Sequence, residues 1–427
     1  MFSFVYTLSI RLYGAALRLA SPFHAKARLA AAGRRDLLAR IQQALSGNTA
    51  PVAWFHAASL GEFEQGRPVM EAFRAQYPEY KILLTFFSPS GYEIRKNYAG
   101  ADYIFYLPLD TPDNARQLIE AVRPAIAFFI KYEFWYNYLR ELHQRGVPTL
   151  SFSAIFRPGQ VFFKPYGGPY RKLLTYFDHI LVQNKESDEL LRSLGLTAVT
   201  RAGDTRFDRV AQIVANKKPI LIAEAFKEDT PLLVIGSAWQ ADMDVLIPVL
   251  NAFDKPLKVI IAPHEIHDAE IERWRGQLSG KSVRYSEVVQ AGRDQSAVQD
   301  SRYLIIDNIG MLTSLYQYGD FAYVGGAFGK GLHNILEPAT FGMPLFFGPR
   351  YEKFQEAVDL VRLGGAFSVG NSEHLRVAFE RIYGDKQAHT AAAKASADYV
   401  ASGVGATALV MEVTQKVISQ RLSKNTQ

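Results

Sequence analysis

Residues 323–349, YVGGAFGKGLHNILEPATFGMPLFFGP, contain the stretch of sequence that decides the fold. An apolar run ends in Gly325-Gly326, a loop of small residues follows, and a helical pattern begins shortly after His333-Asn334. This order is typical of a strand, a loop and a helix in an α/β sheet. Glycines let the backbone approach a phosphate closely, and the N–H groups at a helix N-terminus attract anions. A glycine-rich connection that binds nothing is the alternative.

Further groups suited to a nucleotide occur near this segment and before it. Glu337 lies at the start of the helix, where its carboxylate could accept hydrogen bonds from a ribose diol. Residues 307–312 (DNIGML) begin another helix, whose N-terminal amides could line a pocket for a base. Residues 236–239 (GSAW) and 262–264 (APH) each follow an apolar run and could contact a phosphate.

Apolar runs alternate with helical patterns along the rest of the chain. Strands that alternate with helices form parallel, doubly wound sheets. The sequence therefore predicts an α/β fold of two Rossmann-like domains facing a central cleft, with ligands at the carboxyl ends of the strands. The predicted strands are residues 52–58, 81–87, 103–107, 125–131, 148–153 and 179–183 in one set, and 231–236, 257–262, 303–306, 321–325 and 344–348 in the other.

The 427 residues are too many for one ordinary hydrophobic core. We expect residues 1–40 to form a separate basic, membrane-associated segment. Residues 41–212 and 213–427 are expected to form the two domains, with a turn (NKKP) near their boundary. A last helix, at about residues 387–420, is expected to cross back onto the first domain.

The charge of the chain is concentrated at its N-terminus. Residues 1–40 contain seven arginines and lysines but one aspartate, so they account for the whole net charge of +6. The rest of the chain therefore has no net charge, which argues against a basic surface for nucleic acid.

Residues 1–20 are mostly apolar and predict an amphipathic helix that lies in a membrane surface. Two arginines disfavour a membrane span, because each costs about 2.5–3.5 kcal/mol at mid-bilayer. The basic run that follows would face anionic head groups and keep the body of the protein on the cytoplasmic side. The alternatives are a core helix of the first domain, a cleaved or loosely packed first helix, and a signal peptide, which the absence of early positive charge disfavours. The polar positions recur every three or four residues: Ser3, Thr7, Arg11, Gly14 and Arg18.

Glu62 follows the first predicted strand at the point where a helix begins, within HAASLGEFEQG. A carboxylate at the carboxyl end of a strand could act as a catalytic base, and Gly61 leaves it sterically accessible. The structural alternative is a capping box, because Ser59 and Glu62 have the S-x-x-E spacing that closes a helix N-terminus.

Other charged residues follow strands of the first domain. Lys131 and Glu133, in KYEFWYN, could bind substrate together or form a local ion pair. Arg157, at the end of SFSAIFR, could meet an anionic acceptor. Arg206 lies in AGDTRFDR near the domain junction, where a hinge network is the alternative to a ligand contact.

Several classes of chemistry lack their sequence signals. Cysteine is absent, which excludes disulfides, thiolate metal sites and cysteine catalysis. Nucleophile-elbow, P-loop and dinucleotide fingerprints are also absent. His264 and His267 are three apart, but no third metal ligand is evident. The sequence favours a transferase that uses neither metal nor cofactor and stabilises the leaving phosphate with helix dipoles and side chains.

These motifs resemble the 3-deoxy-D-manno-octulosonic acid (Kdo) transferases, a family of GT-B glycosyltransferases, and the resemblance covers nearly the whole chain. It implies transfer of Kdo from CMP-Kdo to a lipid A precursor (lipid IVA) in lipopolysaccharide core biosynthesis, at the cytoplasmic face of the inner membrane. Residues 41–212 would bind the acceptor and residues 213–427 would bind CMP-Kdo. The motifs occur in the family's order: HAASLGE, KYEFWYN, SAIFR, AGDTRFD, GSAW, DNIGMLTSLYQYGDFAYVGGAF and HNILEPATFGMP.

The resemblance also implies roles for single residues. Glu62 would be the catalytic base, and the sugar would be transferred with inversion. Ser59, Gly61, Lys131, Glu133, Arg157 and Arg206 would line the acceptor side. On the donor side, Gly310, Met311 and Leu312 would hold the cytosine, Glu337 the ribose, and Gly325, Gly326, Ala327, His333 and Asn334 the phosphate.

The chain departs from the family pattern at two places. Pro263-His264-Glu265 stands where the family commonly has proline, arginine and histidine, so an expected arginine contact to CMP is missing. The loop before His333 reads GKGL, and we expect Lys330 to supply the lost positive charge. Two other functions stay open. The protein could be a GT-B transferase that uses a UDP-sugar, or a peripheral membrane protein that binds a nucleotide sugar without turnover.

Overall fold

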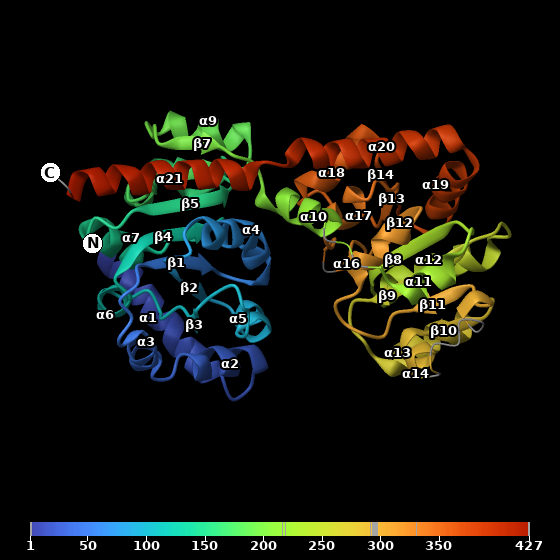
Figure 1. The fold of residues 1–427 in the computed structure, drawn as a ribbon, viewed down its shortest axis with the longest axis horizontal. Coiled ribbons are helices and arrows are strands. Elements are labelled where there is room, and N and C mark those ends of the chain that lie inside the picture. The colour runs from blue at the N-terminus through green and yellow to red at the C-terminus, as the bar shows by residue number, and fades with distance from the viewer. Residues whose placement is uncertain are drawn as a thin grey trace. The chain divides into compact units, whose positions relative to one another are not determined.

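The computed structural model describes residues 2–215, 217, 219–290, 292, 298–329 and 331–425, with side chains to residue 421. The chain divides into two compact units (Figure 1). The first unit contains Met1–Arg209 together with Val404–Gln427, and the second contains Val210–Gly403.

The first unit is built on a parallel seven-stranded sheet with the order β3-β2-β1-β4-β5-β6-β7. The central strands are buried on both faces, which explains why they appear in the sequence as continuous apolar runs. The strands are β1 (Val52–Ala57), β2 (Lys81–Phe86), β3 (Tyr103–Tyr106), β4 (Pro124–Ile130), β5 (Thr149–Ala154), β6 (His179–Val182) and β7 (Val199–Arg201).

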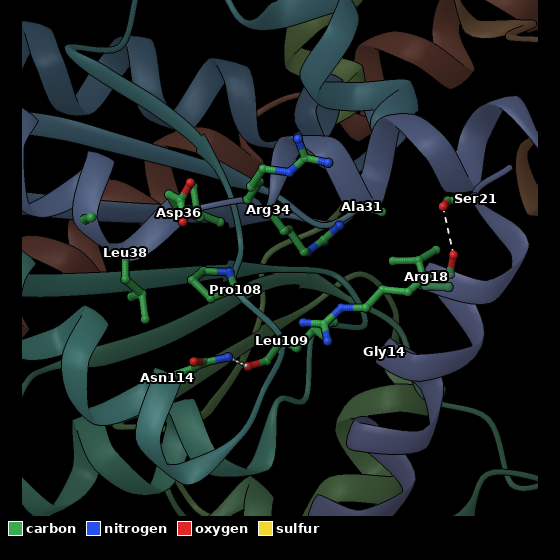
Figure 2. A pocket seen from close by; sticks show the side chains of 14 residues that line it. Gly14, Arg18, Ser21, Ala31, Arg34, Asp36, Leu38, Pro108, Leu109 and Asn114 are labelled. Atoms are coloured by element: carbon green, nitrogen blue, oxygen red, sulfur yellow. Dashed lines mark hydrogen bonds between the residues drawn. The ribbon is translucent and has the colours of Figure 1, made fainter.

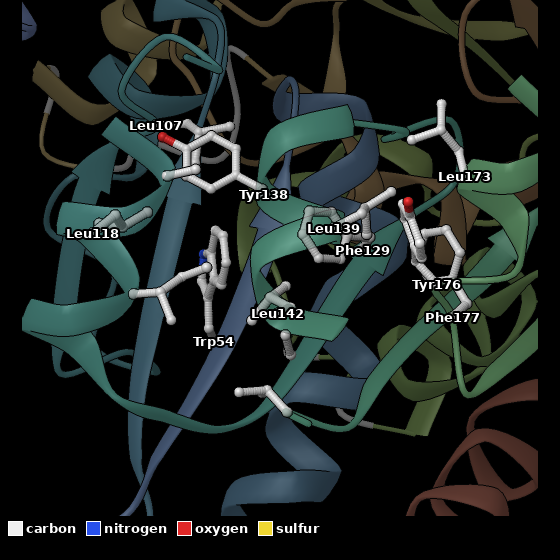
Figure 3. Packing of buried hydrophobic residues seen from close by; sticks show 14 of the residues in the cluster. Trp54, Leu107, Leu118, Phe129, Tyr138, Leu139, Leu142, Leu173, Tyr176 and Phe177 are labelled. Carbon is white, nitrogen blue, oxygen red and sulfur yellow. The ribbon is translucent and has the colours of Figure 1, made fainter. Parts of the chain in front are cut away.

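Hydrophobic cores cover both faces of this sheet, because successive side chains of a strand point to opposite faces. Trp54 packs against Phe129 and Tyr138 on one face (Figure 3), and Phe55 packs against Phe128 on the other. The helices of this unit are α1 (Phe2–Ala20), α2 (Ala25–Gly33), α3 (Leu37–Leu45), α4 (Leu60–Gln76), α5 (Pro89–Arg95), α6 (Pro112–Val122), α7 (Tyr136–Gln144), α8 (Gly168–Leu174), α9 (Lys185–Ser193) and α21 (Ala406–Asn425). Helix α10 (Thr205–Ala215) begins in this unit and continues into the second.

The second unit repeats this plan with a parallel sheet of order β10-β11-β9-β8-β12-β13-β14. Its strands are β8 (Leu232–Ala238), β9 (Lys258–Pro263), β10 (Ser282–Arg284), β11 (Tyr303–Ile305), β12 (Phe321–Val324), β13 (Leu345–Phe347) and β14 (Ala366–Ser368). Its helices are α11 (Leu221–Lys227), α12 (Gln240–Ala252), α13 (Asp268–Gln277), α14 (Tyr285–Gln290), α16 (Leu312–Leu315), α17 (Leu336–Thr340), α18 (Gln355–Leu363), α19 (Ser372–Gly384) and α20 (Lys386–Gly403).

The strand order reverses beside the first strand of each sheet. Strand β1 pairs with β2 on one side and with β4 on the other. Strand β8 pairs in the same way with β9 and β12. At such a reversal the connections leave toward opposite faces of the sheet, so a crevice opens at the carboxyl ends of the two strands.

The predicted α/β class with two parallel sheets is confirmed. Strands β7, β10 and β14 were not predicted, because their residues (VTR, SVR and AFS) do not form a continuous apolar run. The single last helix predicted at residues 387–420 is wrong. It is divided into α20 and α21 at Gly405, whose φ of +116° is a conformation that interrupts a helix.

Helix α1 packs against the first unit through one side. The hydroxyl of Tyr6 donates to Asp110 Oδ2 at 2.7 Å, and Gly14 is buried against Leu109. Burial raises the pKa of Asp110 to about 6. Within the described part of the chain, no helix is both long and apolar enough to cross a membrane.

The face that α1 leaves exposed is apolar. At about 100° per residue, five of the exposed large apolar side chains fall within one arc of about 100°, and the exposed Tyr13 lies outside it. Of the predicted polar stripe, Ser3, Thr7 and Gly14 are buried or half-buried, whereas Arg11 and Arg18 are exposed at the border of the apolar arc. The exposed apolar side chains of this arc are Phe4, Val5, Leu8, Leu12 and Leu19.

Asp208 on α10 fixes the start of α21. Its Oδ1 accepts a hydrogen bond from the backbone N–H of Gly405 at 2.6 Å. Its Oδ2 accepts from the N–H and the hydroxyl of Thr407, both at 2.7 Å. A buried carboxylate at a helix N-terminus satisfies amides that the helix itself leaves unpaired, and it is favoured by the helix dipole.

We therefore expect Asp208→Ala to lower the free energy of unfolding by about 2 kcal/mol, because charge-assisted bonds to buried amides are lost. Urea unfolding followed by circular dichroism measures this change. Asp398→Ala is the matched control, because this exposed aspartate on α20 pairs only with Lys394 at the surface. The control should change stability by about 0.5 kcal/mol or less, and equal losses in both variants would contradict the assignment.

Candidate functional site

Glu62 lies in the first turn of α4, directly after β1 and at the reversal of strand order in the first sheet. Its Oε2 accepts a hydrogen bond from the hydroxyl of Ser59. The Ser59 side chain makes no capping bond to the helix, so the capping box considered as an alternative is not formed. The half-buried carboxylate therefore sits at the carboxyl edge of the sheet, next to the exposed Gly61.

A buried polar cluster lies beside Glu62 at the same end of the sheet. His56 on β1 is fully buried, and its Nε2 lies 3.1 Å from Oε2 of Glu133. Its Nδ1 lies 3.1 Å from the carbonyl oxygen of Thr85 on β2. The indole N–H of Trp135 donates to the same Glu133 oxygen at 2.6 Å. The cluster joins the ends of β1, β2 and β4, and Glu133 is a buried structural partner of His56.

Lys131 and Arg157 both contact Tyr132, which with Arg157 lines a shallow hollow of about 440 Å³. Lys131 has a φ of +68°, which is unusual for a residue other than glycine and which occurs where surrounding structure imposes it. Its Nζ lies 5.3 Å from the ring centre of Tyr132, and Arg157 Nη1 donates to the Tyr132 hydroxyl at 3.2 Å. The lining adds Phe134, Gln160, Val161 and Phe162 to Tyr132 and Arg157.

Arg206 is paired inside the first unit. Its Nη2 lies 2.7 Å from Oδ2 of the buried Asp204, and Gln65 of α4 donates to Oδ1 of the same carboxylate at 3.0 Å. Burial by itself would raise the pKa of Asp204, but the charge of Arg206 and the hydrogen bonds hold that pKa below its ordinary value. Arg206 is thus tied to the start of α10 beside Asp204.

In the second unit, Asp242 joins the two loops at the reversal of strand order. Its Oδ2 accepts from the N–H groups of Trp239, at 3.0 Å, and Gly326, at 2.9 Å. Its Oδ1 accepts from the hydroxyl of Tyr323 at 3.0 Å. Three donors satisfy this buried carboxylate, so the loop after β8 and the loop after β12 are held against each other.

The two glycines predicted to bind phosphate are required by this close approach. A Cβ at Gly325 would lie 2.2 Å from the carbonyl oxygen of Ser237. Gly326 has a φ of +97°, and a Cβ there would lie 2.3 Å from the carbonyl oxygen of Gly331. Only glycine fits either position. Ala327 follows them as a buried residue.

His264, His333 and Trp239 form a stack at this site. The rings of His264 and His333 are 4.2 Å apart and nearly parallel, and those of Trp239 and His264 are 4.4 Å apart. His264 is exposed and directly follows Pro263 at the end of β9. The predicted donor-site residues from three strand ends thus lie together.

The stack also determines which nitrogen of His333 carries the proton. The indole N–H of Trp239 is only a donor, and it lies 3.0 Å from His333 Nε2. Nε2 is therefore the acceptor, and the neutral ring carries its proton on Nδ1. Burial, with a smaller contribution from His264, lowers the pKa of His333 to about 4.

Glu337 connects α17 with α16. Its Oε2 accepts from the hydroxyl of Thr313 at 2.7 Å, and its Oε1 accepts from the side-chain amide of Asn334 at 3.0 Å. Residues 310–312 precede Thr313 directly, and Gly310 has a φ of +94°. The residues predicted to hold the ribose and the base, Glu337 with Gly310, Met311 and Leu312, are therefore neighbours.

Lys330 lies outside the described residues, so its predicted role stays a prediction. His267 lies 3.2 Å from Glu265. In the described part of the chain, no group of three histidine or carboxylate side chains is arranged to hold a metal ion.

Known proteins similar to this chain are Kdo transferases. The sequence profile of the 3-deoxy-D-manno-octulosonic-acid transferases matches residues 32–209. The transferase of this name from Chlamydophila psittaci is 29% identical over 340 residues, which are 74% of each chain. That from Aquifex aeolicus is 27% identical over 329 residues, which are 75% of this chain and 83% of the relative.

The chain is thus similar to the Kdo transferases over about three quarters of its length. Its fold is the GT-B glycosyltransferase fold. The crystal structure of a UDP-N-acetylglucosamine 2-epimerase from Listeria monocytogenes superimposes with a TM-score of 0.60 at 12% identity, covering 87% of this chain and 98% of the other. At this identity the likeness concerns the fold alone.

The sequence alone did not single out two residues that organise the sites. One of them is His56, a polar residue inside the apolar strand β1, where it is buried. A histidine within an apolar run was the signal in the sequence that could have identified it. Asp242 lies three residues after Trp239, the spacing of a helix cap, and forms a D-x-D sequence with Asp244. In the structure the carboxylate of Asp242 bridges two loops, and Asp244 accepts from the side chain of Gln240.

We expect His333 to titrate at about pH 4, which the chemical shift of its Hε1 proton measures by NMR, with His333→Gln assigning the signal. Because this pKa lies below the ordinary 6.5, the unfolded chain binds more protons between these values. The contribution of His333 to stability is therefore complete above about pH 6.5 and declines as the pH falls toward 4. A midpoint near 6.5 for His333 would contradict the assignment of its buried, neutral state.

Proposed function

We propose that this glycosyltransferase moves Kdo from CMP-Kdo to a lipid A precursor, lipid IVA, in the synthesis of the lipopolysaccharide core. One observation carries the proposal: Glu62, the residue that matches the family's catalytic base, lies at the reversal of strand order and is held by a side-chain hydroxyl instead of closing a helix cap. Its carboxylate is accessible as a proton acceptor.

The proposed reaction uses Glu62 as the general base. Its carboxylate accepts the proton of an acceptor hydroxyl while the hydroxyl oxygen attacks the anomeric carbon of Kdo. The bond from that carbon to the phosphate oxygen breaks, and CMP leaves with the bonding electron pair. Attack opposite to the leaving group inverts the anomeric configuration. A well-placed base contributes about 10²–10⁴-fold to such a step.

The second unit is proposed to bind the donor. Gly325 and Gly326 let the loop after β12 pack closely against the loop after β8, and this pair of loops is proposed to lie against the phosphate. The Nδ1–H of neutral His333 would donate a hydrogen bond to the phosphate, and Glu337 would accept from the ribose hydroxyls. In this proposal the chain's own donors stabilise the leaving phosphate, without a metal or a cofactor.

The exposed face of α1 supports a place at the membrane surface. A helix that packs on a soluble domain usually turns its apolar side inward. Here α1 packs on the domain through Gly14 and half-buried side chains such as Phe2 and Ile10, and yet the apolar Phe4, Leu12 and Leu19 are exposed on its other side. This arrangement suits partial burial of α1 in the inner membrane, on the cytoplasmic side where CMP-Kdo would be available.

Glu62→Gln should lower kcat about 10²–10⁴-fold, because the amide cannot accept the proton. The increase in mass of a tetraacylated lipid A precursor, incubated with CMP-Kdo and EDTA, measures the transfer. Glu64→Gln is the matched control and should keep kcat within about threefold, because Glu64 lies on the same helix as Glu62 but pairs with Arg95 of α5 and with Arg209.

The donor is tested in the same assay. CMP should compete with the donor equally well in wild type and Glu62→Gln, since Glu62 belongs to the first unit. Stronger competition by UDP would assign a UDP-sugar donor instead. Equal losses in Glu62→Gln and Glu64→Gln would contradict the assignment of the base.

The double variant Leu8→Ser/Leu12→Ser should weaken binding to phospholipid vesicles by about tenfold or more, because burial of each leucine contributes up to about 2 kcal/mol. Co-sedimentation with vesicles measures this. Leu221→Ser/Leu363→Ser, which changes two similarly exposed leucines of the second unit, should bind as wild type does. Unchanged binding of the α1 variant would remove this face from the membrane contact.

A further inference from the structure

A pocket of about 510 Å³ lies in the first unit beside α1 (Figure 2). It is bounded by α1, by the junction of α2 with α3, and by the segment that follows β3. This volume is within the usual range for ligand sites, about 300–1,000 Å³. Its lining includes Gly14, Arg18, Arg34, Arg35, Asp36 and Asn114.

The lining is positively charged. Arg18, Arg34 and Arg35 contribute three guanidinium groups, and Asp36 contributes the one carboxylate of the lining. Among the residues that the structure describes, none of these three arginines forms an ion pair with a carboxylate. Such a concentration of positive charge beside an open volume favours an anionic ligand.

The three arginines differ in how they are held. Arg34 is fixed, since its guanidinium donates to the carbonyl oxygens of Leu107 at 2.9 Å and Phe87 at 2.6 Å, and lies over the Phe87 and Tyr106 rings. Arg18 and Arg35 are exposed. Figure 2 shows Arg18 extending from α1 toward Leu109. The pocket thus combines one rigid cation with two that can adjust to a ligand.

The position of the pocket relates it to the apolar face of α1. Arg18 is adjacent in sequence to the exposed Leu19 and lies at the border between the apolar arc and the side of α1 that packs on the domain. A lipid whose acyl chains lie along the exposed face would therefore bring its head group to the level of Arg18. Guanidinium groups match phosphate because their planar N–H donors engage two oxygens at once.

We propose that this pocket binds the phosphate of a membrane phospholipid head group. The proposal deepens the membrane association suggested above and rests on it. The phosphate is held by Arg18 and Arg35 beside the fixed Arg34, while the acyl chains follow the apolar face of α1. The N-terminal segment then recognises single anionic lipids in addition to being attracted by the general charge of the surface.

The experiment compares two double variants that remove the same charge. Arg18→Gln/Arg35→Gln changes the pocket, and Arg11→Gln/Arg28→Gln changes two exposed arginines of the same segment that do not line it. Binding to vesicles of phosphatidylcholine with phosphatidylglycerol is measured by co-sedimentation at physiological salt. If the arginines only contribute electrostatic attraction to the anionic membrane surface, at about 1 kcal/mol per charge, either double variant should lose about thirtyfold in vesicle binding.

The pocket pair should lose at least ten times more binding than the control pair. Equal losses in the two pairs would overturn the proposal, because general attraction then explains both. Arg34 is left unchanged because its bonds to backbone carbonyls stabilise the fold. Equal melting temperatures of the two variants without lipid would show that both are folded.

A second measurement separates a lipid from free phosphate. Short-chain dihexanoyl phosphatidylglycerol, below its micelle concentration, should raise the melting temperature of wild type and of Arg11→Gln/Arg28→Gln in a saturable manner, but not that of Arg18→Gln/Arg35→Gln. An equal effect of inorganic phosphate at the same ionic strength would overturn the lipid assignment. Neither measurement uses a sugar donor, so both stand apart from the transferase assay, and kcat in detergent should be unchanged in the pocket variant.

Discussion

The reversal of strand order beside the first strand of each parallel sheet is the constraint on which both sites depend. Because β1 pairs with β2 and β4, and β8 with β9 and β12, the loops that follow these strands meet at one edge and are directed to opposite faces. Glu62 and the His56–Glu133 pair lie at the first reversal, and the Asp242 bridge lies at the second.

Buried polar groups then fix the loops that the topology brings together. Asp242 accepts three hydrogen bonds from two loops, and Asp208 accepts three that start α21. An unpaired buried carboxylate would cost far more than these bonds contribute, so each carboxylate permits one arrangement of its loops. Burial, with a smaller contribution from His264, lowers the pKa of His333 and keeps its ring neutral, and the neutral ring accepts from Trp239 at Nε2.

Helix α1 is apolar on two sides: half-buried Phe2, Tyr6, Ile10 and Leu17 pack on the domain, and a second apolar arc is exposed. In the folded unit its packing side brings Arg18 next to Arg34 and Arg35, which come from a different part of the chain. An apolar surface and a cationic pocket therefore adjoin, a combination that suits a phospholipid better than either a buried core or a soluble anion.

The sequence by itself determined the α/β class, most strands, the glycine-rich turn at Gly325-Gly326 and the place of Glu62 after β1, because apolar runs and turn residues are local signals. The tertiary structure decided the partners: His56 meets Glu133 across 77 positions, Trp239 meets His333 across 94, and Asp242 meets Gly326 across 84. It also showed that Ser59 binds the carboxylate of Glu62 instead of capping α4. The physical reason is that periodicity reports which face of an element is buried, whereas a hydrogen bond between distant residues exists only after the sheet has fixed which strands are neighbours.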